Sequence, residues 1–286
     1  MDAYLEDVLA GRARLLMDGA MGTMLAARGV NLDAKLELLN LTDPAMITEI
    51  HRAYVEAGSQ AITTNTFCAH ARYLGEDATP SDVFAAAVRC ARDAGARYVA
   101  ADMGPLREFV DPFGPISEDE AYDLFAGQAR AAQEAGADFA IIETMFDLTE
   151  ATIAVRAVRE NTELPAFATM AFSDGGRTMF GVTPRQAARG LVEAGAAAIG
   201  ANCALPPAGL RPVAQAMREV ASDMPIIVQA NAGLPEKREE GMRYPVDAAE
   251  YVADVRGILE DGAAIIGGCC GTDPTYIAAL AQLLAE

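Results

Sequence analysis

Short apolar runs alternate with amphipathic helical stretches along the whole chain, and this alternation limits the possible folds more than any other feature. Helices between successive strands are typical of parallel sheets, because a parallel connection needs a long crossover. Eight strands are predicted: Arg14–Asp18, Ala61–Thr66, Tyr98–Met103, Phe139–Thr144, Ala166–Phe172, Ala198–Asn202, Ile226–Ala230 and Ala264–Gly268. Eight units in 286 residues favour one closed (β/α)8 barrel. We therefore predict an α/β fold with a single barrel domain over residues 1–286.

The helical stretches carry the residues that begin and end helices. Ser, Thr or Asp lies near the start of several of them, and each ends in Gly. The clearest examples cover residues 43–58, 81–95, 118–136, 183–195 and 247–262. A short helix is also expected at the N-terminus, before the first strand.

Three longer irregular stretches follow strands or their first turns: Gly29–Asn40, Pro105–Ile116 and Gly233–Pro245. In a barrel such loops lie at the carboxyl ends of the strands, where active sites are found.

Charge and cysteine content narrow the classes of partner and compartment. The net charge is −19, from 22 basic and 41 acidic residues, and no basic stripe could neutralise phosphates. We therefore expect neither nucleic acid nor membrane as a partner. The N-terminus lacks the apolar stretch of a signal peptide, and no apolar run approaches the roughly 20 residues of a membrane span. Five cysteines, two of them adjacent, argue against a disulfide framework and favour the reducing cytoplasm.

Three cysteines fall where predicted strands end. Cys203 follows the sixth strand, and Cys269 and Cys270 follow the eighth. Consecutive strand residues point to opposite faces, so adjacent cysteines can face one point only where the strand has ended. Glycines that can adopt positive φ flank the pair: Gly267, Gly268 and Gly271. Three thiolates with an open fourth position match a catalytic zinc site, whereas cysteines in isolation would be small buried hydrophobic residues.

A zinc ion held by three thiolates favours one kind of chemistry. The sulfurs already offset the charge of the metal, so the site is a poor source of hydroxide. A fourth thiol binds there as thiolate and becomes a nucleophile at neutral pH. We therefore predict alkyl transfer to a substrate thiol. The alternative from another class of protein is a structural or partner-binding barrel in which zinc only joins two strand ends.

Residues at other strand ends indicate an amino-acid substrate. Asp18 ends the first strand, and the small residues Gly19 and Ala20 let backbone N–H groups approach an anion. The Asp18 carboxylate can hold a substrate ammonium while these amides hold the substrate carboxylate. Glu143 ends the fourth strand and is a second candidate for the ammonium. The alternatives are a turn or cap role for Asp18 and a buried arginine partner for Glu143.

The remaining polar candidates are less specific. Asn65 and Asn231 follow the second and seventh strands, and Asn65 is a candidate substrate-binding residue, with a turn role as the alternative for both. His51 lies at helical spacing and is expected at the surface or in packing. His70 lies in a loop from which it can contact substrate. Two further cysteines are expected to be buried hydrophobic residues: Cys68 and Cys90.

Six segments together resemble the homocysteine S-methyltransferase family: DGAMGT, ELLNLTDP, IHRAYVEAGSQAITTNTF, GANCAL, QANAGLP and GGCCGTDP. The resemblance runs from about residue 12 to residue 284, and the glycine-flanked cysteine pair with the upstream Asn–Cys is its most specific part. It implies a zinc-dependent enzyme that methylates homocysteine to methionine.

The resemblance also implies roles for individual residues. Zinc would be held by Cys203, Cys269 and Cys270. The homocysteine ammonium would be bound by Asp18 and Glu143, and its carboxylate by the backbone around Gly19 and Ala20. Asn231 matches an asparagine that fills the fourth zinc position in the methionine synthase branch when substrate is absent.

The sequence is compatible with three kinds of methyl donor. TTNTF, NCAL and NAGLP are most similar to the methionine synthase branch, and its folate- and cobalamin-binding modules do not fit in 286 residues. Methylcobalamin on a separate corrinoid protein would then dock at the barrel mouth. Betaine needs an aromatic site for its quaternary ammonium, and without tryptophan this role falls to Phe67, Phe109 and Phe113. The third donor is the sulfonium S-methylmethionine.

Overall fold

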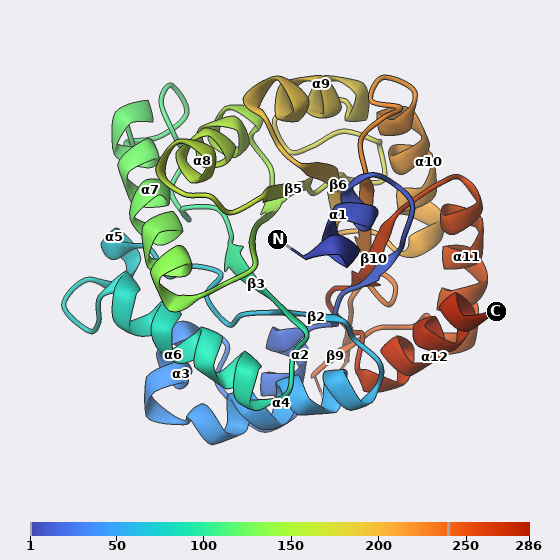
Figure 1. Cartoon of the computed structure of the whole chain (residues 1–286), viewed down its shortest axis with the longest axis horizontal. Coiled ribbons are helices and arrows are strands. Elements are labelled where there is room, and N and C mark those ends of the chain that lie inside the picture. Colours follow the sequence, from blue (N-terminus) through green and yellow to red (C-terminus); the bar gives the residue numbers. More distant parts are fainter. Residues whose placement is uncertain (1, 239–240) are drawn as a thin grey trace.

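The computed structural model describes residues 2–238 and 241–286, and its centre is a parallel sheet curved into a nearly closed barrel (Figure 1). The strands are hydrogen-bonded in the order β1-β10-β7-β6-β5-β4-β3-β2. Their bounds are β1 Leu15–Leu16, β2 Ala61–Thr63, β3 Tyr98–Met103, β4 Phe139–Met145, β5 Ala166–Met170, β6 Ala198–Asn202, β7 Ile226–Ala230 and β10 Ile265–Gly268. The predicted (β/α)8 barrel is confirmed.

The ring closes between β1 and β2 through a glutamine and not through a regular ladder. The Gln60 backbone N–H donates to the Leu16 carbonyl at 2.8 Å, and the Leu16 N–H donates to the Gln60 side-chain oxygen at 3.0 Å. At the carboxyl end of the same gap, Thr63 donates two hydrogen bonds to the Asp18 carboxylate. The contacts that close the barrel between β1 and β2 therefore include Asp18, a candidate site residue.

Helices surround the strands in Figure 1. They are α1 Ala3–Leu9, α2 Met21–Ala26, η1 Leu36–Leu38, α3 Leu39–Thr42, α4 Pro44–Glu56, α5 Ala71–Leu74, α6 Pro80–Asp93, α7 Glu118–Ala135, α8 Leu148–Asn161, α9 Pro184–Ala194, α10 Pro207–Arg218, α11 Ala248–Glu260 and α12 Pro274–Ala285. The predicted helices begin at side-chain caps: Asp43, Thr79, Ser117, Thr183 and Asp247. Only α6 begins earlier than predicted, because Pro80 occupies its first turn.

Several strands are shorter than predicted at their carboxyl ends. Beyond β2, the Thr66 N–H turns back to the Thr64 carbonyl at 2.9 Å, and beyond β5 the Ala171 N–H bonds Met145 at 2.9 Å. Residues 64–66 and 171–172 are still buried although they lie past the last strand positions. Their burial explains why the sequence pattern predicted longer strands. Asp18 and Asn65 therefore lie on the first loop residues of the barrel mouth, whereas Glu143 lies within β4.

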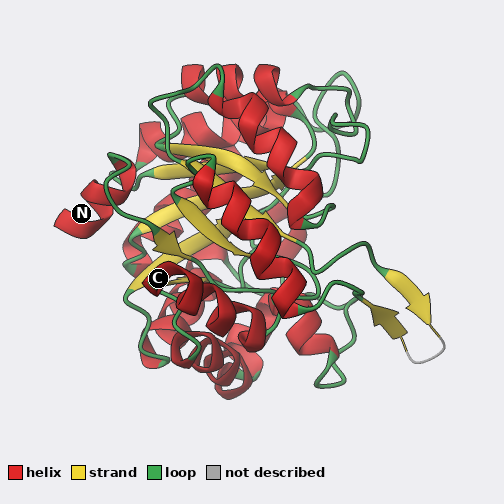
Figure 2. Cartoon of the chain, turned by 90° about the vertical axis from the view of Figure 1, so that its right-hand side faces the viewer, coloured by secondary structure: helices red, strands yellow, loops and turns green. Residues whose placement is uncertain are grey.

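The predicted N-terminal helix α1 closes the opposite end of the barrel (Figures 1 and 2). Its apolar residues Leu5 and Val8 are fully buried and join a cluster inside the barrel that includes Met17, Phe139 and Phe167. The two phenylalanine rings stack there, with centroids 4.3 Å apart. The interior is thus filled by side chains below the mouth, and the cavity that the three cysteines line lies at the carboxyl end.

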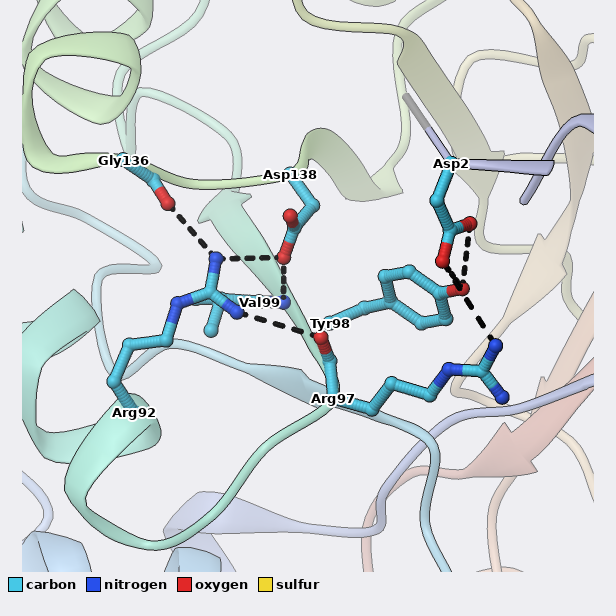
Figure 3. Close-up of polar contacts among 7 residues, drawn as sticks. All are labelled: Asp2, Arg92, Arg97, Tyr98, Val99, Gly136 and Asp138. Carbon is cyan, nitrogen blue, oxygen red and sulfur yellow. Dashed lines mark hydrogen bonds and ion pairs between the residues drawn. The ribbon is translucent and has the colours of Figure 1, made fainter. Parts of the chain in front are cut away.

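Polar contacts fasten α1 to the amino-terminal end of β3 (Figure 3). The Tyr98 hydroxyl lies 2.7 Å from both carboxylate oxygens of Asp2, and the Arg97 guanidinium lies 3.8 Å from the same carboxylate. Asp2 is also the N-cap of α1, because its side chain accepts the Leu5 N–H at 2.9 Å. Side-chain and backbone bonds together therefore orient the helix over the barrel.

Replacing Leu5 with alanine is expected to destabilise the fold without affecting the mouth. Leu5 is 1% exposed, and its truncation leaves a cavity that costs about 2–5 kcal/mol. Urea unfolding measures the loss, and Glu6→Ala on the exposed face of α1 should cost less than about 1 kcal/mol. Equal stability of the two variants would show that α1 is not part of the core.

The predicted irregular loops lie at the mouth but contain short elements of their own. The 29–40 stretch contains η1 and the first residues of α3. The 233–245 stretch contains an antiparallel pair, β8 Glu236–Arg238 and β9 Gly241–Arg243. Figure 2 shows this hairpin projecting from the end of the barrel opposite α1. Within residues 2–238 and 241–286, each helix is too short or too polar to cross a membrane.

Candidate metal and substrate site

The three predicted cysteines converge at the mouth of the barrel. The Cys203 and Cys270 sulfurs are 3.9 Å apart, and all three sulfurs, including that of Cys269, lie within 4.8 Å of one another. Tetrahedral zinc with bonds of about 2.3 Å would place its sulfur ligands about 3.8 Å apart. The cluster therefore fits a zinc ion with little movement. Cys269 and Cys270 come from the end of β10, and Cys203 comes from the end of β6.

Left-handed backbone turns Cys203 toward the pair. Cys203 and Ala204 have φ of 57° and 58°, a conformation that side-chain-bearing residues rarely adopt. The Cys203 N–H still bonds the Gln229 carbonyl at 2.9 Å, and the Cys269 N–H bonds Ala230 at 2.7 Å. Strand β7, between the two cysteine-bearing strands, thus holds both ligand segments in place. Such strain at non-glycine residues is typical of functional sites.

The role predicted for the flanking glycines is only partly correct. Gly271 has φ of 83°, as predicted, but Gly267 and Gly268 are not at positive φ. These two glycines instead allow close approach of neighbouring chain. An ideal Cβ on Gly267 would lie 2.7 Å from the Met17 Cβ, and one on Gly268 would lie 2.7 Å from the Thr272 Cβ. The motif therefore needs glycine for space at Gly267 and Gly268, and for both space and conformation at Gly271.

A cavity of about 380 Å³ opens beside the cysteines. The three cysteines line it together with all the residues predicted to bind substrate: Asp18, Gly19, Ala20, Asn65 and Glu143. Asn231 is buried at 3% exposure and does not line this cavity, and its side-chain oxygen has no hydrogen-bond partner among the described residues. An unpaired amide oxygen is compatible with its predicted role as a fourth ligand, which stays a prediction.

Two carboxylates flank the cysteine cluster, the buried Asp18 and the half-buried Glu143. Asp18 accepts hydrogen bonds from the Thr63 N–H at 2.9 Å and the Thr63 hydroxyl at 2.8 Å, and burial raises the pKa of Asp18 to about 7. Burial, with the Cys203 and Asp18 charges, raises the pKa of Glu143 to about 8. Desolvated carboxylates of this kind gain most from a cationic partner. Arg107 is the only arginine among the described residues that line the cavity, and the Glu143 carboxylate accepts a hydrogen bond from the Asn202 amide.

The raised pKa of Asp18 makes stability depend on pH. Between about 4 and about 7 the folded protein holds a proton that the unfolded chain has released, so its free energy of unfolding decreases as the pH rises through this range. We expect the urea midpoint of the zinc-free protein to be higher at pH 5 than at pH 8. Asp18→Asn should weaken this dependence, and an unchanged profile in that variant would contradict the assignment.

The other predicted polar residues divide between the cavity and the packing. The Asn65 amide nitrogen donates to the Leu36 carbonyl at 2.7 Å and so holds the loop that contains Leu36. The predicted contact of Asn65 with substrate is supported only by its place in the lining of the cavity. His51 is fully buried in packing, and burial lowers its pKa to about 3. His70 caps α5 through its Nδ1, which accepts the Tyr73 N–H at 3.3 Å, and His70 is not among the cavity residues.

The two remaining cysteines are buried, as predicted. Cys90 lies in α6 with its sulfur 3.6 Å from the Pro44 carbonyl. Cys68 also lines the cavity, and burial and the Glu37 charge raise its pKa to about 12. Cys68 is not part of the group of three cysteines whose sulfurs lie close enough together to hold a metal ion.

Two further acidic residues line the cavity, Glu37 and Asp102. Glu37 is 5% exposed, and its Oε1 accepts the Cys68 N–H at 2.9 Å while its Oε2 has no partner among the described residues. Asp102, near the end of β3, is also 5% exposed, and its Oδ1 has no partner within the described part of the chain. Glu37 lies in a loop helix, so strand-end position could not identify it. With Asp18 and Glu143 they give the cavity four carboxylates.

Tyr244 lies next to the cysteine pair and was missed by motif reasoning. An ideal Cβ on Gly271 would lie 2.5 Å from the Tyr244 Cβ, so the tyrosine occupies the space beside that glycine. Hydrogen bonds with Cys203 and Cys269, and then with Tyr244, lower the pKa of Cys270. Tyr244 therefore lies close enough to the cluster to affect the ionisation of Cys270. It comes from the loop after β9, and nothing in the local sequence links it to a cysteine.

Only one of the three candidate phenylalanines lines the cavity. Phe67 does so, and its ring packs against Gly104, where an ideal Cβ would lie 2.5 Å from the ring. Phe109 and Phe113 are 47% and 62% exposed and pack instead on Phe180, with centroids 5.3 and 5.0 Å away. The predicted aromatic site for a quaternary ammonium is thus not assembled from all three.

The fold and the cluster define a (β/α)8 barrel with a candidate thiolate metal centre at the carboxyl ends of its strands. The family profile described as homocysteine S-methyltransferase matches residues 15–284. The chain therefore belongs to the homocysteine S-methyltransferase family and is a homocysteine methyltransferase domain.

Curated relatives are longer than this chain. Methionine synthase of Mycobacterium tuberculosis is 33% identical over 310 residues, which cover 100% of this chain and 26% of that protein. Methionine synthase of Mycobacterium leprae is 30% identical, with 100% and 25% covered. The chain spans about a quarter of the length of these relatives. Among solved structures, the metallated homocysteine methyltransferase MmuM from Escherichia coli shares the fold, with a TM-score of 0.80, 24% identity and 98% and 99% covered.

Proposed function

We propose that this domain binds zinc through Cys203, Cys269 and Cys270 and methylates homocysteine to methionine. The observation that carries the proposal is the convergence of three sulfurs within 4.8 Å beside a cavity rich in carboxylates. Zinc at this cluster would supply a Lewis acid that keeps the substrate sulfur deprotonated at neutral pH. Three protein ligands leave one tetrahedral position for that sulfur.

The residues around the cluster would orient the amino-acid end of the substrate. Asp18 and Glu143 present carboxylates to an ammonium, and Thr63 fixes the Asp18 carboxylate through two hydrogen bonds. The chain at Gly19 and Ala20 begins α2 without a side-chain cap, which leaves N–H groups available for a carboxylate. The Ala20 N–H has only a long bond of 3.3 Å to Thr272. Substrate binding by these residues would therefore place the thiol at the metal.

The donor is best sought among three compounds. Similarity to part of methionine synthase favours methylcobalamin as the donor that reaches the mouth of the cavity. The carboxylates of the cavity favour a cationic donor such as S-methylmethionine or betaine. These two observations point to different donors, so we propose homocysteine as the acceptor and take the donor as the variable of the experiment.

A parallel assay tests the proposal. Purified zinc-loaded protein is incubated with homocysteine and, separately, with methylcobalamin, S-methylmethionine or betaine, and methionine is measured. We expect methionine with at least one donor and none after zinc is removed by a chelator. Methionine with methylcobalamin alone would support the corrinoid donor.

Cobalt substitution tests the alternative of a purely structural zinc. A thiol that enters the coordination sphere of cobalt changes its sulfur charge-transfer absorption, whereas a metal with four fixed ligands gives the same spectrum with and without homocysteine. We expect a change on addition of homocysteine. An unchanged spectrum, together with unfolding on metal removal, would instead support a barrel that zinc only stabilises.

A further inference from the structure

Asn202 lies at the end of β6, directly before Cys203, and its side chain is fully buried. Its Oδ1 accepts from the Thr144 N–H at 2.9 Å and from the Thr169 hydroxyl at 2.8 Å. Its Nδ2 donates to the Thr144 hydroxyl at 2.8 Å and to the Glu143 carboxylate at 3.4 Å. One amide thus uses both its donors and both its acceptors on two neighbouring strands, β4 and β5.

These bonds hold β4 in an unusual shape. Thr144 has φ of 61°, which a β-branched residue adopts only when its surroundings impose it. The register between β4 and β5 shifts between Ile142 and Met145, around the same point. Asn202 binds both the backbone and the hydroxyl of Thr144, so it fixes this turn from two directions. Glu143, the preceding residue, consequently has its carboxylate directed by Asn202.

Asn202 therefore connects the two halves of the site. The next residue along the chain is the cysteine of β6, and the carboxylate that it contacts is a predicted partner of the substrate ammonium. A thiol held at the metal and an amino group held at Glu143 would have their separation set through this one amide. A ligand without an amino group would not depend on it.

We propose that Asn202 is a positioning residue that makes the site selective for thiols carrying an α-amino group. The proposal rests on the proposed function, since it assumes that homocysteine binds through its sulfur and its ammonium. Asn202 acts through Glu143 and does not itself need to touch the substrate. It follows that loss of the amide should weaken amino-bearing thiols selectively.

The test compares homocysteine with 4-mercaptobutanoate, which is the same molecule without the amino group. Binding of each to the zinc-loaded protein is measured by calorimetry, together with the zinc content. Asn202→Asp keeps the size and the accepting oxygen but replaces the donor to Glu143 with an oxygen. We expect homocysteine to bind about tenfold more weakly, the effect of losing one hydrogen bond to a charged group. Affinity for 4-mercaptobutanoate should change less than twofold, and zinc should be retained.

Thr169→Val is the matched control, because it removes a partner of the same Asn202 oxygen without touching Glu143 or Thr144. It should leave the ratio of the two affinities unchanged. If Asn202→Asp fails to fold, Asn202→Ser removes the same donor without a new buried charge and should lower the ratio as well.

The outcomes separate this inference from the proposed function. A wild-type protein that binds both thiols equally would contradict ammonium recognition and thus the proposed substrate mode. A wild-type protein that prefers homocysteine, with folded Asn202 variants that keep the full preference, would overturn the role of Asn202 alone. Equal weakening of both thiols, or loss of zinc, would show that Asn202 only supports the fold around Cys203.

Discussion

Cys269→Ser should lose its zinc and, with it, the methylation of homocysteine. The protein is expected to hold about one zinc per chain, and the serine variant less than a tenth of that, because a hydroxyl at neutral pH is a far weaker ligand than a thiolate. Without the metal only about 3% of the substrate thiol is ionised at pH 7, and the thiol is no longer held in place, so the rate of methionine formation should fall by more than about thirtyfold. Elemental analysis and the methionine assay measure the two effects on the same sample.

Cys90→Ser is the matched control for that experiment. Cys90 is equally a buried cysteine, but it lies in α6 with its sulfur near the Pro44 carbonyl, which a serine hydroxyl can also reach. It should keep both zinc and activity. If Cys269→Ser retained zinc at the affinity of the wild type, the metal centre would have to lie elsewhere.

The sequence could predict the metal ligands because their signal is local. Adjacent cysteines among glycines have few uses, and the apolar run before them showed that they follow a buried strand. The same reasoning placed Asp18 and Glu143 at the mouth, since every parallel strand of a barrel ends on that face. Fold and position followed from periodicity, without any knowledge of contacts between distant residues.

The residues that sequence reasoning missed act through partners far away in the chain. Tyr244 meets Cys270 because a loop folds back over Gly271, and Glu37 reaches the cavity from a loop helix. Asn202 was visible as a polar strand end, but its four hydrogen bonds depend on the positive φ of Thr144 and on neighbouring strands. No periodic pattern encodes such contacts, because they arise only when the barrel has closed.

Asp18→Asn should reduce homocysteine affinity by about a hundredfold while stabilising the zinc-free protein. Asparagine can keep both bonds to Thr63, with its oxygen accepting the N–H and its amide donating to the hydroxyl, so the loop should stay in place. It cannot supply the negative charge that an ammonium needs in a desolvated cavity, and loss of such a buried charge pair costs several kcal/mol. Calorimetric titration of the zinc-loaded variant with homocysteine measures this loss.

The stabilising effect has the opposite sign for a related reason. The folded wild type at pH 8 must keep the Asp18 carboxylate ionised out of water, against a pKa raised to about 7, and asparagine removes that cost.

Glu150→Gln is a suitable comparison, since burial also raises the pKa of Glu150 to about 7, yet this residue does not line the cavity. It should increase stability at pH 8 and leave homocysteine affinity unchanged. If Asp18→Asn changed neither the free energy of unfolding nor the affinity for homocysteine, the ionised Asp18 carboxylate would not be the group that binds the substrate ammonium. A higher free energy of unfolding together with a lower affinity for homocysteine would mean that the ionised Asp18 carboxylate binds the ligand but destabilises the fold.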